Sequence, residues 1–213
     1  MKKTNGIFIF RPAACLFLCI LALSVFFLPA CSREKEQPKA GVANPNSGDA
    51  VYLRLKKQTE QNPKDSSAWY ALADLYYQNN LYDRAAEAYK KVVELRPSDG
   101  YSWLKMGVSY DRQNKPKEAV AAYEKAVKYM PSYAVAYNNL GVAYGKLGES
   151  AKQITAFKKA VRLRKGYATA RYNLGYAYLK TGDKKAALEQ YKALKDIDEG
   201  IAGALMEQIK GGA

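Results

Sequence analysis

The stretch Trp103-Leu-Lys-Met-Gly-Val-Ser-Tyr110 is the clearest copy of a pattern that recurs along this 213-residue chain. Its residue types recur 34 residues earlier and 34 residues later, and again one step further on. Four such series are Pro63, Pro97 and Pro131; Tyr76, Tyr110, Tyr144 and Tyr178; Ala73, Gly107, Gly141 and Gly175; Tyr89, Tyr123, Phe157 and Tyr191. A recurrence with this period indicates a stacked array of small units, because no unit can bury its apolar face alone.

Each unit has the pattern of two helices joined by a short turn. Apolar residues recur at three- and four-residue steps, as on the buried face of an amphipathic helix. The small residues allow two helices to approach closely, and the large aromatic residues fill the space beside them. Between the helices lies a further series, Asn80, Asn114, Gly148 and Gly182, of types that tolerate the left-handed conformation. The prolines end each second helix. The sequence therefore predicts an all-α fold.

Residues 66–201 resemble the tetratricopeptide repeat, with unit 1 at 66–99, unit 2 at 100–133, unit 3 at 134–167 and unit 4 at 168–201. The resemblance implies an α-solenoid of four helix hairpins. Residues 51–65 are expected to form a lone N-terminal capping helix, and residues 202–213 a short C-terminal capping helix and tail. The last units depart from the pattern at Gln153, Lys165, Arg171 and Glu199, which weakens the last interfaces. A more polar final unit is normal because nothing stacks beyond it.

The first 30 residues are expected to be a signal peptide and are set apart from the fold. Lys2, Lys3 and Arg11 precede an apolar run that ends in Leu28-Pro29-Ala30-Cys31, which resembles the lipobox of bacterial lipoproteins. The resemblance implies that Cys31 is lipidated, with residues 31–50 as a flexible tether. Two alternatives are an uncleaved anchor and an ordinary signal peptide with an incidental cysteine. We expect a lipid-anchored envelope protein facing the periplasm. The residue after the cysteine is Ser32 and not aspartate, which resembles the pattern of outer-membrane lipoproteins in enteric bacteria.

Composition argues against catalysis. The chain has no histidine, and its three cysteines all lie at or before Cys31. The body therefore lacks histidine- and cysteine-based nucleophile–base pairs and histidine and cysteine metal ligands. We therefore expect no enzyme activity, cofactor, metal or small-molecule substrate. The formal charge is +14, and loss of Lys2, Lys3 and Arg11 would leave +11. This excess indicates either a solvated basic face or attraction to anionic polymer, lipid or acidic protein, whereas nucleic acid is not expected for an exported lipoprotein.

In tetratricopeptide arrays the first helices line a concave groove, and the resemblance places the candidate peptide-binding residues there. They are Tyr70, Asp74, Tyr77, Tyr101, Lys105, Arg112, Asn138, Asn139, Lys146, Tyr172, Asn173, Tyr176 and Lys180. Asn139 and Asn173 resemble asparagines that hold a peptide main chain, since an amide both donates and accepts. Arg112, Lys146 and Lys180 would form a basic rail for carboxylates. The alternative is that the asparagines satisfy local helix ends and the tyrosines pack on each other.

These expectations combine into a non-catalytic scaffold of the bacterial cell envelope. It would bind an extended or helical, partly acidic segment of another envelope protein, and the lipoprotein resemblance suggests pilus, secretin or outer-membrane complex assembly. Two other classes are open: a charge-driven binder of anionic cell-wall or lipid polymer, and a regulatory subunit of an envelope enzyme. Fold analogy does not choose among them.

Overall fold

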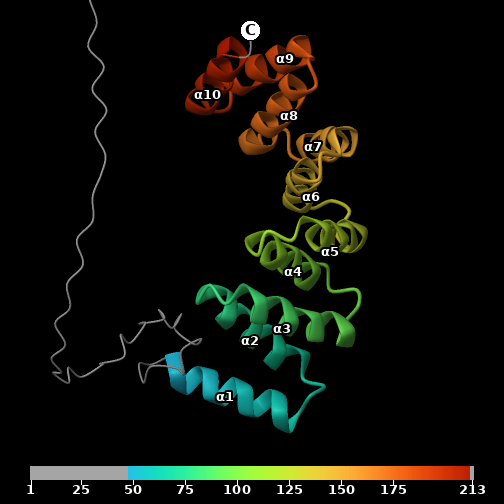
Figure 1. The fold of residues 1–213 in the computed structure, drawn as a ribbon, viewed down its shortest axis with the longest axis vertical. Helices are drawn as coiled ribbons and strands as arrows, with labels where there is room; N and C mark the ends of the chain where they lie inside the picture. Colours follow the sequence, from blue (N-terminus) through green and yellow to red (C-terminus); the bar gives the residue numbers. More distant parts are fainter. Residues whose placement is uncertain (1–47, 212–213) are drawn as a thin grey trace, which may run out of the picture. The chain divides into compact units, whose positions relative to one another are not determined.

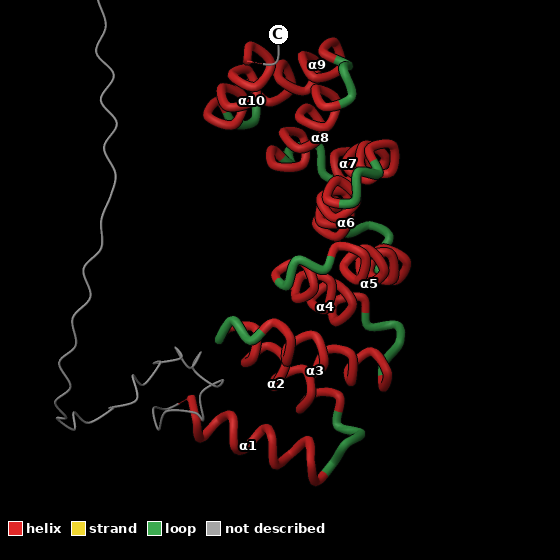
Figure 2. Tube along the Cα trace, viewed as in Figure 1, coloured by secondary structure: helices red, strands yellow, loops and turns green. Residues whose placement is uncertain are grey.

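The computed structural model describes residues 48–211. The predictions for the signal peptide, Cys31 and most of the tether lie outside this range. The described part consists of ten helices: α1 (Gly48–Gln61), α2 (Ser66–Gln78), α3 (Tyr82–Leu95), α4 (Gly100–Arg112), α5 (Pro116–Tyr129), α6 (Ala134–Lys146), α7 (Ser150–Leu163), α8 (Ala168–Lys180), α9 (Lys184–Lys195) and α10 (Glu199–Gly211) (Figures 1 and 2). Between residues 48 and 211, no helix is both long and apolar enough to cross a bilayer.

The helices pack as successive hairpins. Helices α2 and α3, α4 and α5, α6 and α7, and α8 and α9 form the four pairs, and each second helix also packs against the first helix of the next pair. At the two ends, α1 packs on α2, and α10 packs on α8 and α9 (Figure 1). The prediction of an all-α solenoid of four hairpins is confirmed.

Small residues set the close approach within each hairpin. A Cβ atom added to Gly107 would lie 2.6 Å from the Tyr123 ring, and one added to Gly141 would lie 2.6 Å from the Phe157 ring. Both rings are fully buried. The predicted pairing of a small residue with a large ring therefore holds in units 2 and 3, where it fills the space between the two helices.

Unit 4 differs from this prediction. The side chain that meets Gly175 is Leu205 of α10, with its Cδ2 atom 2.6 Å from an added Cβ, and Tyr191 is only half-buried. Leu205 belongs to a buried cluster with Ala187, Leu194 and Ala202. The prediction that Tyr191 fills the gap is wrong, because the final helix α10 occupies that space instead.

The turns inside the hairpins match the expectation from sequence. Asn80 and Asn114 have φ angles of 59° and 56°, and Gly148 and Gly182 have φ angles of 74° and 83°. All four residues thus adopt the left-handed conformation, which asparagine and glycine reach at low cost. This series ends each first helix at the same place in every unit.

The turns between units are held by one recurring hydrogen bond. The indole Nε1 of Trp69 donates to the carbonyl of Pro63 at 3.0 Å, and that of Trp103 donates to Pro97 at 2.8 Å. In unit 4 the Nε atom of Arg171 donates to the carbonyl of Lys165 at 2.9 Å. Arg171 therefore preserves the bond that tryptophan makes elsewhere, so the expectation that it only weakens the interface is incomplete.

Candidate functional site

All thirteen residues of the predicted groove lie on the first helices of the four hairpins, α2, α4, α6 and α8. We call the surface formed by their polar side chains the A-helix face. Three interactions join one of these helices to the next: Lys105 Nζ lies 3.2 Å from Asp74 Oδ1, Lys146 Nζ lies 2.9 Å from Asp111 Oδ1, and Asn173 Nδ2 lies 3.0 Å from Asn138 Oδ1. The A-helix face is therefore continuous across all four units.

The junction of units 1 and 2 centres on Asp74. This carboxylate pairs with Lys105 and accepts a hydrogen bond from the hydroxyl of the buried Tyr89. Burial raises the pKa of Tyr89, and the hydrogen bond to Asp74 raises it further because ionised tyrosine would face a carboxylate. Lys105 Nζ also lies 5.6 Å from the ring centre of Tyr77, within the range of a cation–π contact. Both charges at this junction are thus engaged within the protein.

The junction of units 2 and 3 centres on Asp111, a residue that the sequence analysis missed. Its Oδ1 pairs with Lys146, and its Oδ2 accepts a hydrogen bond from Tyr123 at 2.9 Å. Burial raises the pKa of Tyr123, and the charge of Asp111 adds to the increase. Asp111 stands three positions later in its unit than Asp74 does, so no 34-residue series marks it. The basic rail is thereby partly neutralised at Lys146.

A second rail member, Arg112, is exposed and lies near Tyr77. The polar interaction with the Tyr77 side chain is the main cause that raises the pKa of Arg112, so the guanidinium remains charged. Units 1 and 2 are therefore linked by the Asp74–Lys105 ion pair and by the proximity of Arg112 to Tyr77.

The asparagines form a chain of amides between units 3 and 4. Asn138 is only 6% exposed; its Oδ1 accepts from Asn173, and its Nδ2 donates to Asn139 Oδ1 at 3.4 Å. A buried amide with both ends occupied holds the helices together and offers little to a ligand. Asn138 therefore joins α6 to α8 through its side chain. Asn139 and Asn173 are half-buried and remain at the surface.

In unit 4 the A-helix face carries two tyrosine rings and a lysine that face solvent at least in part. The rings of Tyr172 and Tyr176 are stacked, with centres 6.5 Å apart and planes at 3°, and Tyr176 is 37% exposed. Lys180 Nζ lies 5.5 Å from the Tyr176 ring centre, and no carboxylate in the described part of the chain pairs with it. The Lys180 ammonium is therefore available to an external carboxylate.

Two tyrosines of the predicted set lie apart from this open region. The ring of Tyr70 packs edge-on against Tyr89, with centres 5.7 Å apart. The ring of Tyr101, which is 52% exposed, lies 5.4 Å from that of Tyr133, the residue that precedes α6. The structure thus brings Asn139, Asn173, Tyr176 and Lys180 together over two units but leaves Tyr101 beside the turn between units.

Comparison with known proteins gives the same description of the repeats. A family model described as TPR repeat matches residues 110–148, and two described as tetratricopeptide repeat match residues 51–100 with 154–200, and residues 134–167. A comparison with curated proteins gives no significant match.

Several solved structures share the fold. MamA residues 41-end from Desulfovibrio magneticus RS-1 are 25% identical, with a TM-score of 0.67 over 73% of this chain and 88% of that one. YrrB, described as a TPR protein with an unusual peptide-binding site, is 25% identical, with a TM-score of 0.62 over 73% and 84%. PilW, described as a type IV pilus biogenesis factor, is 20% identical, with a TM-score of 0.62 over 76% and 78%, and shows the fold alone. With matches that together span most of residues 51–200 and four hairpins of the expected geometry, this chain belongs to the tetratricopeptide-repeat family.

Proposed function

We propose that this protein is a non-catalytic, membrane-anchored scaffold of the bacterial cell envelope that binds a peptide segment or helix of a partner protein on its A-helix face. Its tetratricopeptide fold supports a role in protein interaction, and its likeness to YrrB, described as having a peptide-binding site, supports a peptide ligand. The observation that carries the proposal is the polar surface that continues across the four units through side chains of α2, α4, α6 and α8.

The charges of the A-helix face favour units 3 and 4 as the centre of binding. Lys105 and Lys146 already pair with carboxylates of the neighbouring units, whereas Lys180 has only the Tyr176 ring beside it among its described contacts. An amide such as Asn173 can hold a peptide main chain without regard to its sequence. Exposed tyrosine adds contact area at low entropy cost. A segment with an acidic side chain near an extended stretch fits this combination.

Photo-crosslinking in the native cell tests this proposal. A photoreactive amino acid replaces Tyr176 on the A-helix face, or Lys125 on the second helix of unit 2 as a matched exposed position on another surface. We expect a discrete crosslinked partner, identified by mass spectrometry, from position 176 and not from position 125. Adding Asn173→Ala and Lys180→Ala should reduce that crosslink at least tenfold.

Two results would contradict the proposal. Equal crosslinking from both positions would mean that the A-helix face has no special affinity. A crosslink at position 176 that survives the double substitution would mean that the amide and the ammonium do not hold the partner. Circular dichroism of each variant guards against loss of folding, and Asn138 is left intact because its amide is buried between helices.

The envelope location rests on the resemblance of Leu28-Pro29-Ala30-Cys31 to a lipobox. Lipid on Cys31 would hold the folded body near a membrane surface, in the outer membrane if the cell has one. Mass spectrometry of the Cys31→Ser variant should show an unprocessed, unlipidated chain. An unchanged lipidated product would contradict the assignment. Assembly of a pilus, secretin or other outer-membrane complex is the narrower role suggested by the lipoprotein resemblance, since PilW at 20% identity supports only the fold.

Attraction to an anionic cell-wall or lipid polymer is the second candidate function. Exposed lysines on the second helices favour it, among them Lys90, Lys91, Lys125, Lys128, Lys158, Lys184 and Lys185. Binding of this kind is screened by salt, so affinity for an anionic polymer should fall steeply as ionic strength rises. A salt-insensitive affinity would exclude it. If this protein is instead a regulatory subunit of an envelope enzyme, that enzyme should be identified among the crosslinked partners.

A further inference from the structure

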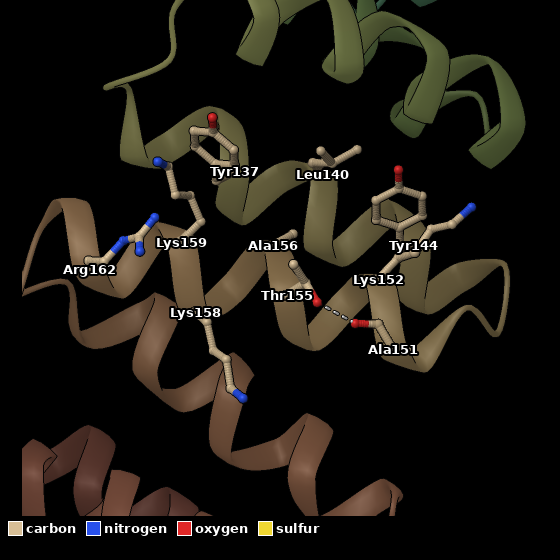
Figure 3. A pocket seen from close by; sticks show the side chains of 10 residues that line it. All are labelled: Tyr137, Leu140, Tyr144, Ala151, Lys152, Thr155, Ala156, Lys158, Lys159 and Arg162. Atoms are coloured by element: carbon tan, nitrogen blue, oxygen red, sulfur yellow. Dashed lines mark hydrogen bonds between the residues drawn. The ribbon is translucent and has the colours of Figure 1, made fainter.

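Unit 3 contains a cavity that lies away from the A-helix face. It has a volume of about 650 Å³ and lies between α6 and α7 (Figure 3). Tyr137, Leu140 and Tyr144 of α6 form its floor. Its volume is in the range of cavities that hold small ligands or side chains.

On the floor of this cavity, unit 3 differs from units 1 and 2 at the position of Tyr137. Trp69 and Trp103 occupy the position of Tyr137 in those units, and their indole groups donate to the turn before the helix. Tyr137 is smaller, and no hydrogen bond from its side chain is found among residues 48–211. Most of the equivalent positions of unit 1, with Trp69 on the floor, line a cavity of only about 390 Å³, to which residues at the end of α4 also contribute.

Every charged residue that lines the rim of the unit 3 cavity is basic. Lys152, Lys159 and Arg162 of α7 surround it, while Lys158 extends toward α8, with Nζ 5.6 Å from the Tyr178 ring centre (Figure 3). Lys152 Nζ lies 5.3 Å from the Tyr144 ring centre, and Lys159 Nζ lies 5.7 Å from that of Tyr137. Two of the rim cations are therefore already held over the aromatic floor.

Unit 1 provides an internal comparison for this charge. Its helix α3 carries Asp83, Glu87 and Glu94 at the positions where α7 carries Ala151, Thr155 and Arg162. Two of these acids, Asp83 and Glu87, line the unit 1 cavity beside Arg84 and Lys91, so that its charges are mixed. Unit 3 thus has no acid at any of these three positions, and its cavity is larger than that of unit 1.

We propose that this cavity, between α6 and α7, is a second binding site that accepts an apolar or aromatic side chain flanked by acidic residues of a protein partner. The floor of Leu140 and two tyrosine rings suits an apolar anchor, since burial of apolar surface is favourable. The basic rim suits carboxylates on either side of that anchor, which would also be attracted over a distance of several ångströms. An anionic polymer would match the rim but would leave the apolar floor unused.

Nearby acids neutralise only part of the rim. Glu149 pairs with Lys152 at 2.6 Å, and Glu124 of α5 accepts a hydrogen bond from the Tyr144 hydroxyl at 2.5 Å. Lys159 and Arg162 have no ion pair among the described residues. The carboxylate of Glu124 is occupied by its hydrogen bond to the floor residue Tyr144. Lys159 and Arg162 therefore remain available to carboxylates of a partner.

The test uses fluorescein-labelled pentapeptides in which Trp, Phe or Leu is flanked by two glutamates on each side. Binding to the full-length protein is measured by fluorescence anisotropy. We expect saturable binding by the anchored peptides. A peptide with serine at the centre should bind at least tenfold more weakly.

Two variants locate the site. The triple substitution Ala151→Asp, Thr155→Glu and Arg162→Glu gives α7 the acids of unit 1. Tyr137→Trp narrows the cavity toward the size seen in unit 1 while keeping every rim charge. Each should weaken the anchored peptide at least tenfold. The double substitution Lys184→Glu and Lys185→Glu makes the same change in net charge on exposed residues of α9 and should alter the affinity less than threefold.

The outcomes separate the alternatives. If none of the anchored peptides binds, or if Tyr137→Trp binds normally, the cavity is not the site and the proposal fails. Equal affinity for the serine peptide, or for polyglutamate, would assign the rim to anionic polymer and would also overturn it. Asn173→Ala with Lys180→Ala should leave this binding unchanged, so the outcome is independent of the A-helix face.

Discussion

At the scale of single residues, two glycine substitutions should have opposite effects on stability. Gly107→Ala would place a Cβ 2.6 Å from the buried Tyr123 ring, and such overpacking typically costs about 1–3 kcal/mol. Gly203→Ala in α10 meets no atom within 4 Å and should stabilise by up to about 1 kcal/mol, because alanine is the better helix former. Urea unfolding followed by circular dichroism measures both. A Gly107→Ala protein as stable as the wild type would mean that the Tyr123 ring shifts without cost.

Tyr123 also makes stability depend on high pH. Its pKa is raised above the ordinary value of 10.0, chiefly by burial and by the charge of Asp111. As pH rises past 10, the unfolded chain loses this proton while the folded chain keeps it, so the free energy of unfolding falls. Tyr123→Phe, a change that Phe157 shows to fit the equivalent site, removes this contribution.

The measurement is the urea midpoint of both proteins between pH 8 and 11. At pH 8 the free energy of unfolding of the variant should be lower than that of the wild type by about 1 kcal/mol, the net contribution of one hydrogen bond. Above pH 10 its midpoint should decline less steeply than that of the wild type. Parallel declines would contradict the assignment of this proton linkage to Tyr123.

The residue scale also shows how far the sequence reaches. Residues that repeat at equal steps, such as the turn series from Asn80 to Gly182, could be placed correctly because each unit imposes the same backbone. Asp111 and Arg171 could not be read in this way. Asp111 accepts a hydrogen bond at a position where no other unit has an aspartate. Arg171 differs from tryptophan in shape but donates the same kind of hydrogen bond to the preceding turn. Interactions that occur in only one unit can be identified only from the three-dimensional structure.

At the scale of helices, the units use two different starts. Asp65 and Asp99 cap α2 and α4 through hydrogen bonds to backbone amides, whereas Tyr133 and Tyr167 begin α6 and α8 without a side-chain cap. Asp99 Oδ2 also accepts from the Ser102 hydroxyl at 2.9 Å. The first helices of units 1 and 2 are therefore stabilised by an N-cap interaction that the first helices of units 3 and 4 lack.

Removal of one cap tests this difference. Asp99→Ala should cost about 0.5–2 kcal/mol, the usual range for an N-cap residue. Lys115 occupies the same cap position at α5 but makes no side-chain cap bond, so Lys115→Ala should change stability by less than about 0.5 kcal/mol. Thermal unfolding by circular dichroism compares the two variants. Equal destabilisation would show that the Asp99 bonds contribute nothing measurable.

Helix contacts also limit what the sequence could say of the candidate site. The placement of all thirteen groove residues on first helices followed from the repeat, because equivalent positions face the same way in each unit. The repeat did not predict which of these side chains are paired within the protein and which are free. Whether a lysine is free or paired depends on which residue of the neighbouring unit lies opposite, as Lys146 and Lys180 show. The cavity in unit 3 likewise depends on a difference between units, which a shared pattern hides.

At the scale of the whole array, each hairpin touches only its neighbours, so damage at one end should remain local. Leu205→Ala in α10 removes a fully buried side chain that packs on Gly175, which should destabilise this end by about 2–5 kcal/mol. Hydrogen exchange should accelerate in α8, α9 and α10, while α2 to α5 keep their protection. Leu53→Ala, at a site 61% exposed on α1, provides the control with little expected change. Equal acceleration across all helices would mean that the array unfolds as one cooperative block, and the neighbour-by-neighbour account of its stability would be wrong.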